Sequence, residues 1–312
     1  MTRKAFLNVR LEVSGSLVLV IFSNLNMKYI SFFTFFIVIQ ILNVSLAIAG
    51  GTSMPPYSQK NEEMTFAFWP DSSPTAMQKR YAGLVQLLRK ELDTEVYFKT
   101  RSNYSEYMES IEKGEFDIAV VNAFDYVKLK NKTQYIPALM RSDELVATFV
   151  TNDKNINDIK DLRRKKIGFA SEYTSVAISS RYLLIKNGVL SSDYTSVFYN
   201  GHISCLQAVV NKSVDVCVTG TLIYQKFSPI KKSNLRVIAK GESMPQLVVL
   251  VHPRLKNRLN AIIKLFLDLD KTKSGRAILD ETYLVILEEF SGEKYHLCEI
   301  ILDYISSHDF NE

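Results

Sequence analysis

Short β-rich runs alternate with amphipathic helical stretches along most of this chain, and this alternation predicts an α/β fold. The segment 65–69 has the aromatic residues of a strand, and 75–92 spaces its apolar positions like the buried face of a helix. The same patterns predict strands at 95–99 and 116–121, with a helix at 104–112 between them. This order is typical of strands joined by crossover helices.

A second set of such units begins at 166–170, and the chain from residue 254 onward is predicted to be mostly helical. The segments 107–121 and 204–218 repeat one order of features, namely a helix, a turn, an apolar residue, an aspartate and a buried strand. The repeat predicts two similar lobes, each with a parallel-type sheet, which present their strand ends to one ligand cleft.

The two repeated aspartates, Asp117 and Asp215, stand at the entry of the buried strands. We interpret them as residues that satisfy backbone amides there, and not as catalytic groups. A hydrolase would also need a nucleophile, a base and an orienting acid. The chain has no G-x-S-x-G, H-E-x-x-H or P-loop motif and only 4 His. The sequence therefore predicts a protein that is not an enzyme.

An uncharged stretch of 21 residues, 29–49, follows Lys28 and ends in Ala47-Ile48-Ala49. A basic residue, an apolar segment and a small-residue end are the features of a secretory signal peptide. We therefore predict that residues 1–49 are a leader cleaved after Ala49 and that the protein is periplasmic. An uncleaved membrane anchor is the alternative, because 21 apolar residues can span a bilayer. Met27 begins a compact signal sequence of its own and is a second candidate start of translation.

The leader changes the meaning of the net charge. The 312 residues include 38 basic and 33 acidic side chains, which gives a formal charge of +5. Four basic residues and one acidic residue precede residue 50, so the remainder has 34 basic against 32 acidic side chains, a net of +2. This near balance removes the main support for a nucleic-acid partner. A charged fraction of 23% with 16 Tyr and 18 Phe also excludes a disordered chain.

The three cysteines are too few for a disulfide scaffold and have no zinc-ligand spacing. Cys205 lies early in a predicted helix and Cys217 late in the strand that follows, so the two can approach one another. Two buried thiols are the slightly favoured interpretation, since cysteine packs as a small hydrophobe. A disulfide is the alternative in an oxidising compartment. No metal site and no cofactor is predicted.

Polar side chains follow the predicted strands at the edge where parallel sheets bind ligands. Thr174 and Ser175 open one helix, and Gly201-His202 open another. Helix N-termini offer backbone N–H groups and a positive partial charge, so hydroxyls and an imidazole there can share an oxyanion. Taken singly, the Thr-Ser pair is also typical of ordinary helix capping, and a lone His is more often a surface or capping residue. Trp69 is either a wall of the cleft or a core residue. Together they predict a site for an anion with several oxygens, and the candidates are Trp69, Tyr104, Asn122, Tyr173, Thr174, Ser175 and His202.

The spacing of these residues resembles that of a known family. Tyr104 lies thirteen positions before Asp117-Ile-Ala, and Gly201-His202 is followed by Ala208-Val209, Asn211-Lys212 and Val214-Asp215-Val216. With the Thr174-Ser175 pair, this pattern is similar to the periplasmic substrate-binding proteins of phosphonate, phosphite and phosphate ABC transporters. The likeness covers about residues 64–290.

This resemblance implies a two-lobed type II periplasmic-binding-protein fold of the α/β class. Lobe 1 would comprise residues 61–145 and 245–312, and lobe 2 residues 146–240. The resemblance further implies a monomer that captures a phosphorus oxyanion between its lobes for the membrane permease of an ABC transporter. It assigns anion contacts to Tyr104, Thr174, Ser175 and His202. The alternative role within the same fold is a binding protein that signals to a membrane sensor kinase or cyclase.

The chain departs from the family pattern at two places. The family's Ser-Thr-Ser-Gly loop is Tyr173-Thr174-Ser175-Val176 here, so the first hydroxyl and the glycine are missing. Members that bind aminophosphonates use acidic residues for the amine, and the corresponding positions here are Leu222 and Leu247. We therefore expect phosphate, phosphite or a small alkyl phosphonate as the ligand, and a 2-aminoalkyl phosphonate to bind poorly.

Overall fold

The structure, a computed structural model, describes residues 7–13, 16–22, 63–199 and 201–309. The apolar stretch 29–49, its cleavage position and the alternative start at Met27 lie outside these residues. The chain divides into two compact units, 1–60 and 61–312. No helix within the described ranges is both long and apolar enough to cross a membrane.

The first unit contains one described element, an antiparallel hairpin. Its strands are β1 (Leu7–Val13) and β2 (Ser16–Phe22), which pair along their whole length from Leu7 opposite Phe22 to Val13 opposite Ser16.

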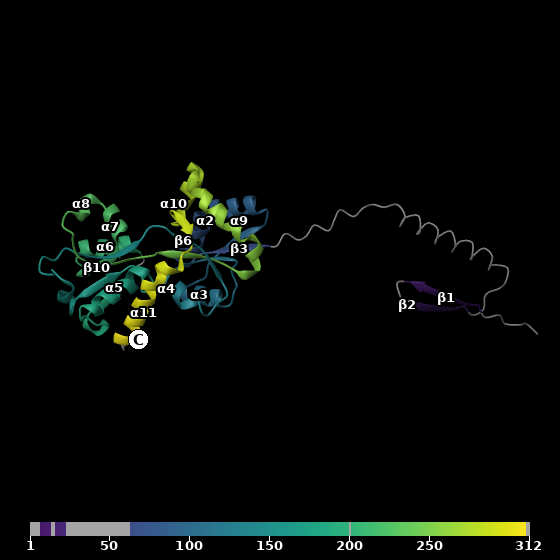
Figure 1. Cartoon of the computed structure of the whole chain (residues 1–312), viewed down its shortest axis with the longest axis horizontal. Helices are drawn as coiled ribbons and strands as arrows, with labels where there is room; N and C mark the ends of the chain where they lie inside the picture. The colour runs from purple at the N-terminus through teal and green to yellow at the C-terminus, as the bar shows by residue number, and fades with distance from the viewer. Residues whose placement is uncertain (1–6, 14–15, 23–62, 200, 310–312) are drawn as a thin grey trace, which may run out of the picture. The chain divides into compact units, whose positions relative to one another are not determined.

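The second unit is built on two mixed sheets (Figure 1). The first has six strands in the order β13-β6-β12-β5-β3-β4. These strands are β3 (Met64–Ala67), β4 (Val96–Lys99), β5 (Ile118–Asn122), β6 (Ile136–Arg141), β12 (Leu247–Val251) and β13 (Leu287–Glu289). The helices around it are α2 (Pro74–Leu92), α3 (Tyr104–Glu112), α4 (Ala123–Leu129), α9 (Leu259–Asp268), α10 (Lys273–Glu281) and α11 (His296–His308).

Alternating residues of the strands supply two cores, one on each face of this sheet. Phe66 of β3 and Phe68 just after it pack with Tyr81 of α2, whereas Ala67 between them packs on the opposite face with Tyr107 of α3. This alternation follows from the two-residue period of a strand. Because both faces are covered by helices, the buried strand β5 is apolar at nearly every position, as the sequence pattern predicts.

The second sheet has five strands in the order β11-β7-β10-β8-β9. They are β7 (Leu145–Thr151), β8 (Lys166–Phe169), β9 (Thr195–Phe198), β10 (Val216–Gly220) and β11 (Arg236–Met244). Helix α5 packs on one face, and α6 and α7 pack on the other. These helices and the short α8 are α5 (Ser175–Lys186), α6 (His202–Val210), α7 (Thr221–Lys226) and α8 (Pro229–Lys232).

Short 3-10 helices complete the connections. They are η1 (Ile159–Leu162), η2 (Ser191–Asp193), η3 (Pro253–Arg258), η4 (Leu269–Lys271) and η5 (Gly292–Tyr295).

The chain passes from the first sheet to the second between β6 and β7, and returns between β11 and β12. The expectation of a parallel-type sheet is wrong for the strands at these crossings. Strand β7 runs antiparallel to β10 and β11, and β12 runs antiparallel to β5 and β6. Two consecutive strands of one sheet can be parallel only if a crossover segment joins them. A strand that enters from the other sheet has no such connection to its neighbours, so it can run in either direction.

The strand-entry aspartates have the structural role that the sequence predicts. The Asp117 Oδ2 accepts a hydrogen bond from the Thr65 backbone N–H at 2.8 Å, and the Asp215 Oδ2 accepts one from the Lys166 N–H at 2.7 Å. Asp117 also pairs with Arg254. Both carboxylates therefore satisfy amides where strands begin.

Cys205 and Cys217 are joined by a disulfide, so the favoured interpretation as two buried thiols is wrong. Cys205 lies in the first turn of α6 and faces β10, which places the two Cα atoms 5.7 Å apart, within the range of a bridge. The bridge ties α6 to the sheet beneath it. Cys298 of α11 is a buried free thiol.

Candidate ligand-binding site

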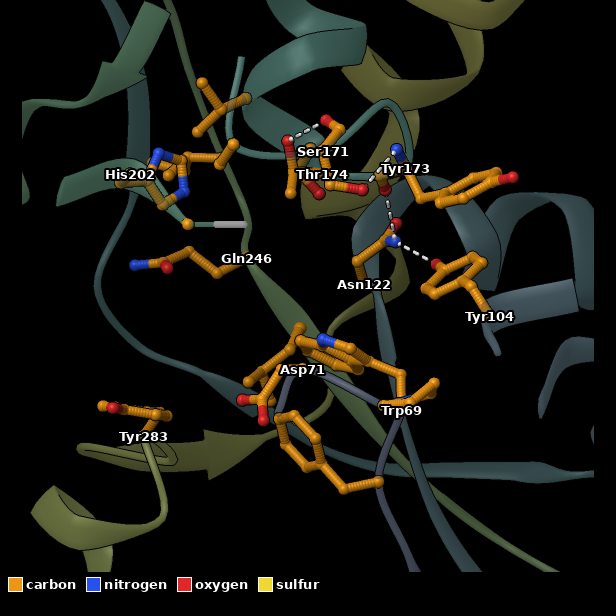
Figure 2. A pocket seen from close by; sticks show the side chains of 18 of the residues that line it. Trp69, Asp71, Tyr104, Asn122, Ser171, Tyr173, Thr174, His202, Gln246 and Tyr283 are labelled. Atoms are coloured by element: carbon orange, nitrogen blue, oxygen red, sulfur yellow. Dashed lines mark hydrogen bonds between the residues drawn. The ribbon is translucent and has the colours of Figure 1, made fainter. Parts of the chain in front are cut away.

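A cavity of about 450 Å³ lies between the ends of the two sheets. Its volume is typical of small-molecule sites. The walls combine residues of both sheets, and all the candidate residues from the sequence are among them: Trp69, Tyr104, Asn122, Tyr173, Thr174, Ser175 and His202. Figure 2 shows His202 on one side of the cavity, Tyr104 and Asn122 on the opposite side, and Thr174 between them.

The N-terminus of α5 forms one wall. Thr174 is the N-cap residue, and its Oγ1 accepts a hydrogen bond from the Ala177 N–H at 3.2 Å and donates one to the Ser171 carbonyl at 3.1 Å. Its hydroxyl is therefore engaged in capping. Ser175 follows with only 7% of its surface exposed, and its Oγ has no hydrogen-bond partner among the described residues. A buried hydroxyl without a partner is costly, so this one is suited to a ligand oxygen.

The N-terminus of α6 forms the facing wall. Gly201 is its N-cap residue, with a φ of 117° that strains any residue with a Cβ. Apart from Gly201 and its chain neighbours, no described atom lies within 4 Å of the place where a Cβ would stand. Among the described residues, no side chain caps this helix end. Backbone N–H groups of the first turn are thereby left for a ligand that approaches along the open side of Gly201.

His202 begins α6 and is neutral at pH 7, because burial lowers the pKa of its imidazole to about 4. The Nδ1 lies 3.2 Å from the Thr219 Oγ1. When Nδ1 accepts the hydroxyl proton of Thr219, the imidazole carries its own proton on Nε2 and is a neutral donor.

Tyr104, Asn122 and the buried Asp125 form a hydrogen-bonded cluster on the third wall. The Tyr104 hydroxyl donates to the Asp125 Oδ2. The Asn122 Nδ2 donates to the Tyr104 oxygen at 2.7 Å, to the Tyr173 carbonyl at 3.2 Å and to the Asp125 Oδ2. Burial raises the pKa of Asp125 to about 7. We call these three residues the Tyr104 cluster.

Sequence reasoning missed Asp125, although a local signal was present. Asn122 is the N-cap residue of α4, and its Oδ1 accepts a hydrogen bond from the Asp125 N–H at 3.0 Å. An Asn followed three positions later by an acidic residue is close to the capping-box pattern. That pattern predicts the helix start, but only the fold brings α3 near enough for Tyr104 to reach the carboxylate.

Tyr173 and Trp69 also line the cavity. The structure records no polar contact of either side chain inside it among the described residues. The Tyr173 ring stacks on that of Tyr104 with centroids 4.6 Å apart, and the side chain is 44% exposed. Trp69 packs on Phe68 with centroids 3.9 Å apart and borders both cores of the six-stranded sheet. Both alternatives weighed for Trp69, a cleft wall and a core residue, are therefore correct.

Five further polar residues of the cavity wall were missed by the sequence analysis: Asp71, Arg141, Ser171, Gln246 and Tyr283. Asp71 forms an ion pair with Arg80 at 2.6 Å, and Arg141 Nη2 donates to the Asp143 Oδ2 at 2.7 Å. Each charge on this wall is therefore matched by a neighbour of opposite sign. Four of them lie in turns or loops between elements, and Arg141 is the last residue of β6, so helical or strand periodicity gives no signal for their place on the wall.

Of the two positions singled out for missing acidic residues, only one reaches the cavity. Leu247 lies on its wall at the start of β12, whereas the exposed Leu222 on α7 is not among the described residues that line it.

The comparison with protein families identifies the chain. The family model described as the periplasmic substrate-binding protein of phosphonate ABC transporters matches residues 66–295. The chain belongs to this family. It is thus an extracytoplasmic solute-binding component of an ABC importer, which is the assignment that the residue pattern predicts.

Curated relatives agree with the family. The "Phosphonates-binding periplasmic protein" of Escherichia coli (strain K12) is 23% identical over 243 residues, which are 72% of each chain. The "Phosphate-import protein PhnD" of Mycolicibacterium smegmatis is 26% identical over 172 residues, or 49% of this chain and 54% of that one.

Solved structures show the same fold. PhnD1 from Prochlorococcus marinus, in complex with methylphosphonate, superimposes with a TM-score of 0.68 at 20% identity over 78% of this chain and 98% of its own. The aliphatic sulphonate binding protein SsuA from Escherichia coli gives a TM-score of 0.54 at 14% identity over 79% of this chain and 87% of its own. The expected two-lobed periplasmic-binding-protein fold of the α/β class is therefore confirmed.

Proposed function

We propose that this binding protein captures phosphate, phosphite or a small alkyl phosphonate in the cavity between its two sheets. The Ser175 hydroxyl, the first-turn N–H groups of α5 and α6 and the His202 imidazole are the proposed contacts on the side of the five-stranded sheet. Tyr104 and Asn122 are the proposed contacts on the side of the six-stranded sheet. Residues 61–145 with 245–312 and residues 146–240 are proposed to act as the two lobes.

The observation that carries this proposal is Ser175, a residue of the cavity wall whose buried hydroxyl has no partner among the described residues. Its position in the first turn of α5 adds the positive end of a helix. A ligand with several acceptor oxygens satisfies both features at once. The facing N-terminus of α6, with its open Gly201, supplies a second set of donors for the same ligand.

The other wall residues favour a small ligand with an apolar substituent. Trp69, Leu145, Val176 and Leu247 offer carbon surface to the cavity, which suits the alkyl group of a phosphonate. An amine would need an acidic side chain that is not already paired. Among the described residues, Asp71 is the one carboxylate on the wall, and it is paired with Arg80. A 2-aminoalkyl phosphonate is therefore expected to bind poorly.

A thermal-shift panel tests the proposal with phosphate, phosphite, methylphosphonate, 2-aminoethylphosphonate and sulfate. We expect at least one of the first three to raise the melting temperature and aminoethylphosphonate to raise it less. His202→Ala should reduce the shift, since one hydrogen bond to a charged ligand contributes about 1.5–3 kcal/mol. No shift from any oxyanion would contradict the proposal, and tighter binding of aminoethylphosphonate than of the other ligands would contradict its ligand preference.

The remaining assignments follow from the family. The chain is proposed to act as a monomer without catalytic activity, to be exported by the predicted leader, and to deliver its ligand to a membrane permease. The relatives are named as binding and import proteins, which supports transport. The alternative of signalling to a membrane sensor has no comparable support.

A further inference from the structure

The hydrogen bonds within the Tyr104 cluster already use the protons that its side chains would need to donate to an anion. A phenol has one proton to donate, and the Tyr104 hydroxyl gives that proton to the Asp125 Oδ2. The Asn122 Nδ2 has two protons, which are shared among the Tyr104 oxygen, the same Asp125 oxygen and the Tyr173 carbonyl. With Asp125 ionised, every recorded donor of this wall is directed away from the ligand.

The conflict is electrostatic as well. Asp125 is only 5% exposed, in the first turn of α4, and is bonded to two residues of the cavity wall. A buried carboxylate at this place repels any anion that enters the cavity, and little water is present to screen the repulsion.

Few charges near Asp125 offset this repulsion. Lys128 of its own helix stabilises the ionised form only in part. The titratable groups on the elements packed around α4 include three tyrosines, which are Tyr104 of α3, Tyr173 before α5 and Tyr182 of α5. On α11, Glu299 is paired with Lys130 and His296, and Cys298 is a buried thiol. Strands β5 and β12 present Asn122 and Leu247 on the cavity side.

We propose that Asp125 is a positioning residue that takes up one proton when the cavity binds its anion. The proton comes from solvent and forms an O–H bond on the carboxylate. The protonated carboxyl group then donates to the Tyr104 oxygen, and the Tyr104 hydroxyl turns its proton toward a ligand oxygen. No bond of the ligand is made or broken, and the wall changes from an acceptor with a negative charge to a neutral donor.

The burial of Asp125 makes this uptake accessible near neutral pH, because it raises the pKa of the carboxyl group to about 7. The inference rests on the proposed function, since it needs an anionic ligand in this cavity. It deepens that function by making the affinity depend on pH through a residue that does not touch the ligand.

Calorimetry with methylphosphonate tests the inference on the wild type, Asp125→Asn and Tyr104→Phe, each at pH 6 and pH 8.5. Two buffers of different ionisation enthalpy give the number of protons taken up at each pH. Any proton that methylphosphonate itself gains or loses is the same in the experiments on all three proteins. A difference in proton uptake between the proteins therefore comes from the protein. The asparagine in place of Asp125 is neutral and can donate to Tyr104 at every pH.

We expect the wild type to take up close to one proton more than Asp125→Asn at pH 8.5. Its affinity should fall between pH 6 and pH 8.5 by about 30-fold more than that of the variant, because each pH unit above the pKa costs a tenfold factor per linked proton. Tyr104→Phe should bind more weakly at pH 6 than the wild type. Asp215→Asn, a matched change of a carboxylate that caps a strand far along the other sheet, should keep the wild-type pH dependence.

Equal proton counts and equal pH slopes in the wild type and Asp125→Asn would overturn the inference and leave the proposed function intact. Failure of the wild type to bind any phosphorus oxyanion would overturn both. If Asp125→Asn does not fold, Tyr104→Phe decides the question, because a pH slope equal to that of the wild type would show that the phenol does not transmit the proton.

Discussion

Thr174 and Ser175 are adjacent residues with hydroxyl side chains, and their hydroxyl groups have different roles. Thr174 caps α5 through hydrogen bonds to the Ala177 N–H and the Ser171 carbonyl. Ser175 has a buried hydroxyl without a partner among the described residues. The sequence offers both as anion contacts and gives no basis to separate them, whereas the hydrogen bonds show that Thr174 serves the fold and leave Ser175 available to a ligand.

This difference gives a prediction for two matched alanine variants. Ser175→Ala should weaken ligand binding by about 10- to 100-fold, because a hydrogen bond to a charged ligand is lost, and should leave the free energy of unfolding unchanged or slightly higher. Thr174→Ala should lower the free energy of unfolding by about 1 kcal/mol through loss of the cap. Calorimetry with the ligand and urea denaturation without it measure the two effects. A Ser175→Ala protein that binds as tightly as the wild type would contradict the assignment.

Tyr104 illustrates a residue whose place was predicted correctly but whose chemistry depends on a neighbour. Its position at the start of a helix makes it a plausible donor from the sequence alone. The contact with Asp125 joins residues 21 positions apart and assigns the phenol proton to the carboxylate. A residue type at a helix start therefore predicts a capacity to donate, and the packing of α3 against α4 decides which acceptor receives the proton.

Helix and strand positions follow closely from local periodicity. The helix expected at 104–112 is α3 (Tyr104–Glu112), and that expected at 75–92 is α2 (Pro74–Leu92). Strands expected at 95–99 and 116–121 begin and end within two residues of β4 and β5. These elements have clear apolar spacing and capping residues, so local signals suffice.

The disulfide between α6 and β10 is an element-level feature that also bears on the site. It closes a segment with a sequence separation of 12 and anchors α6, which begins at His202 and has Gly201 as its N-cap residue. Loop closure in the unfolded chain predicts a stabilisation of about 3 kcal/mol. A variant with Cys205→Ser and Cys217→Ser should therefore lose about that free energy of unfolding, in a denaturation experiment without reductant.

Reductant provides the control for this prediction. Dithiothreitol should destabilise the wild type and Cys298→Ala alike, because both retain the bridge, and should leave the double serine variant unchanged. Two results together would show that the bridge contributes nothing to stability. The unfolding midpoint of the wild type would not change with reductant, and the double serine variant would have the same free energy of unfolding as the wild type.

The two sheets of the second unit are linked by more than the two chain crossings. Tyr304 of α11 packs on Tyr182 of α5 with ring centroids 5.1 Å apart, and the Ser191 hydroxyl donates to the Asp309 Oδ1 at 2.6 Å. Helix α11 thereby contacts the core of the six-stranded sheet and a helix of the five-stranded sheet. Figure 1 shows α11 extending from α4 toward α5.

A ligand in the cavity should couple the two sheets further, because its proposed contacts come from both. At a ligand concentration of 100 times Kd, we expect the free energy of unfolding to rise by about 2.7 kcal/mol. Hydrogen exchange should slow in the first turns of α5 and α6 and also in those of α3 and α4. Protection confined to one of the two sheets would contradict a site shared between them.

The sequence by itself determined the α/β class, the family and seven of the residues that line the cavity. Apolar periodicity, helix capping and motif spacing are local properties, and each is encoded within a few turns of chain. Net charge near zero after the predicted leader also removed the main support for a nucleic-acid role without any structure.

Only the tertiary structure decided how those residues divide their hydrogen bonds. The direction of β7 and β12, the bridge between Cys205 and Cys217, and the contact of Tyr104 with Asp125 all depend on which elements pack together. Hydrogen bonds and charges act over a few ångströms, so partners distant in sequence become visible only when the fold brings them into contact.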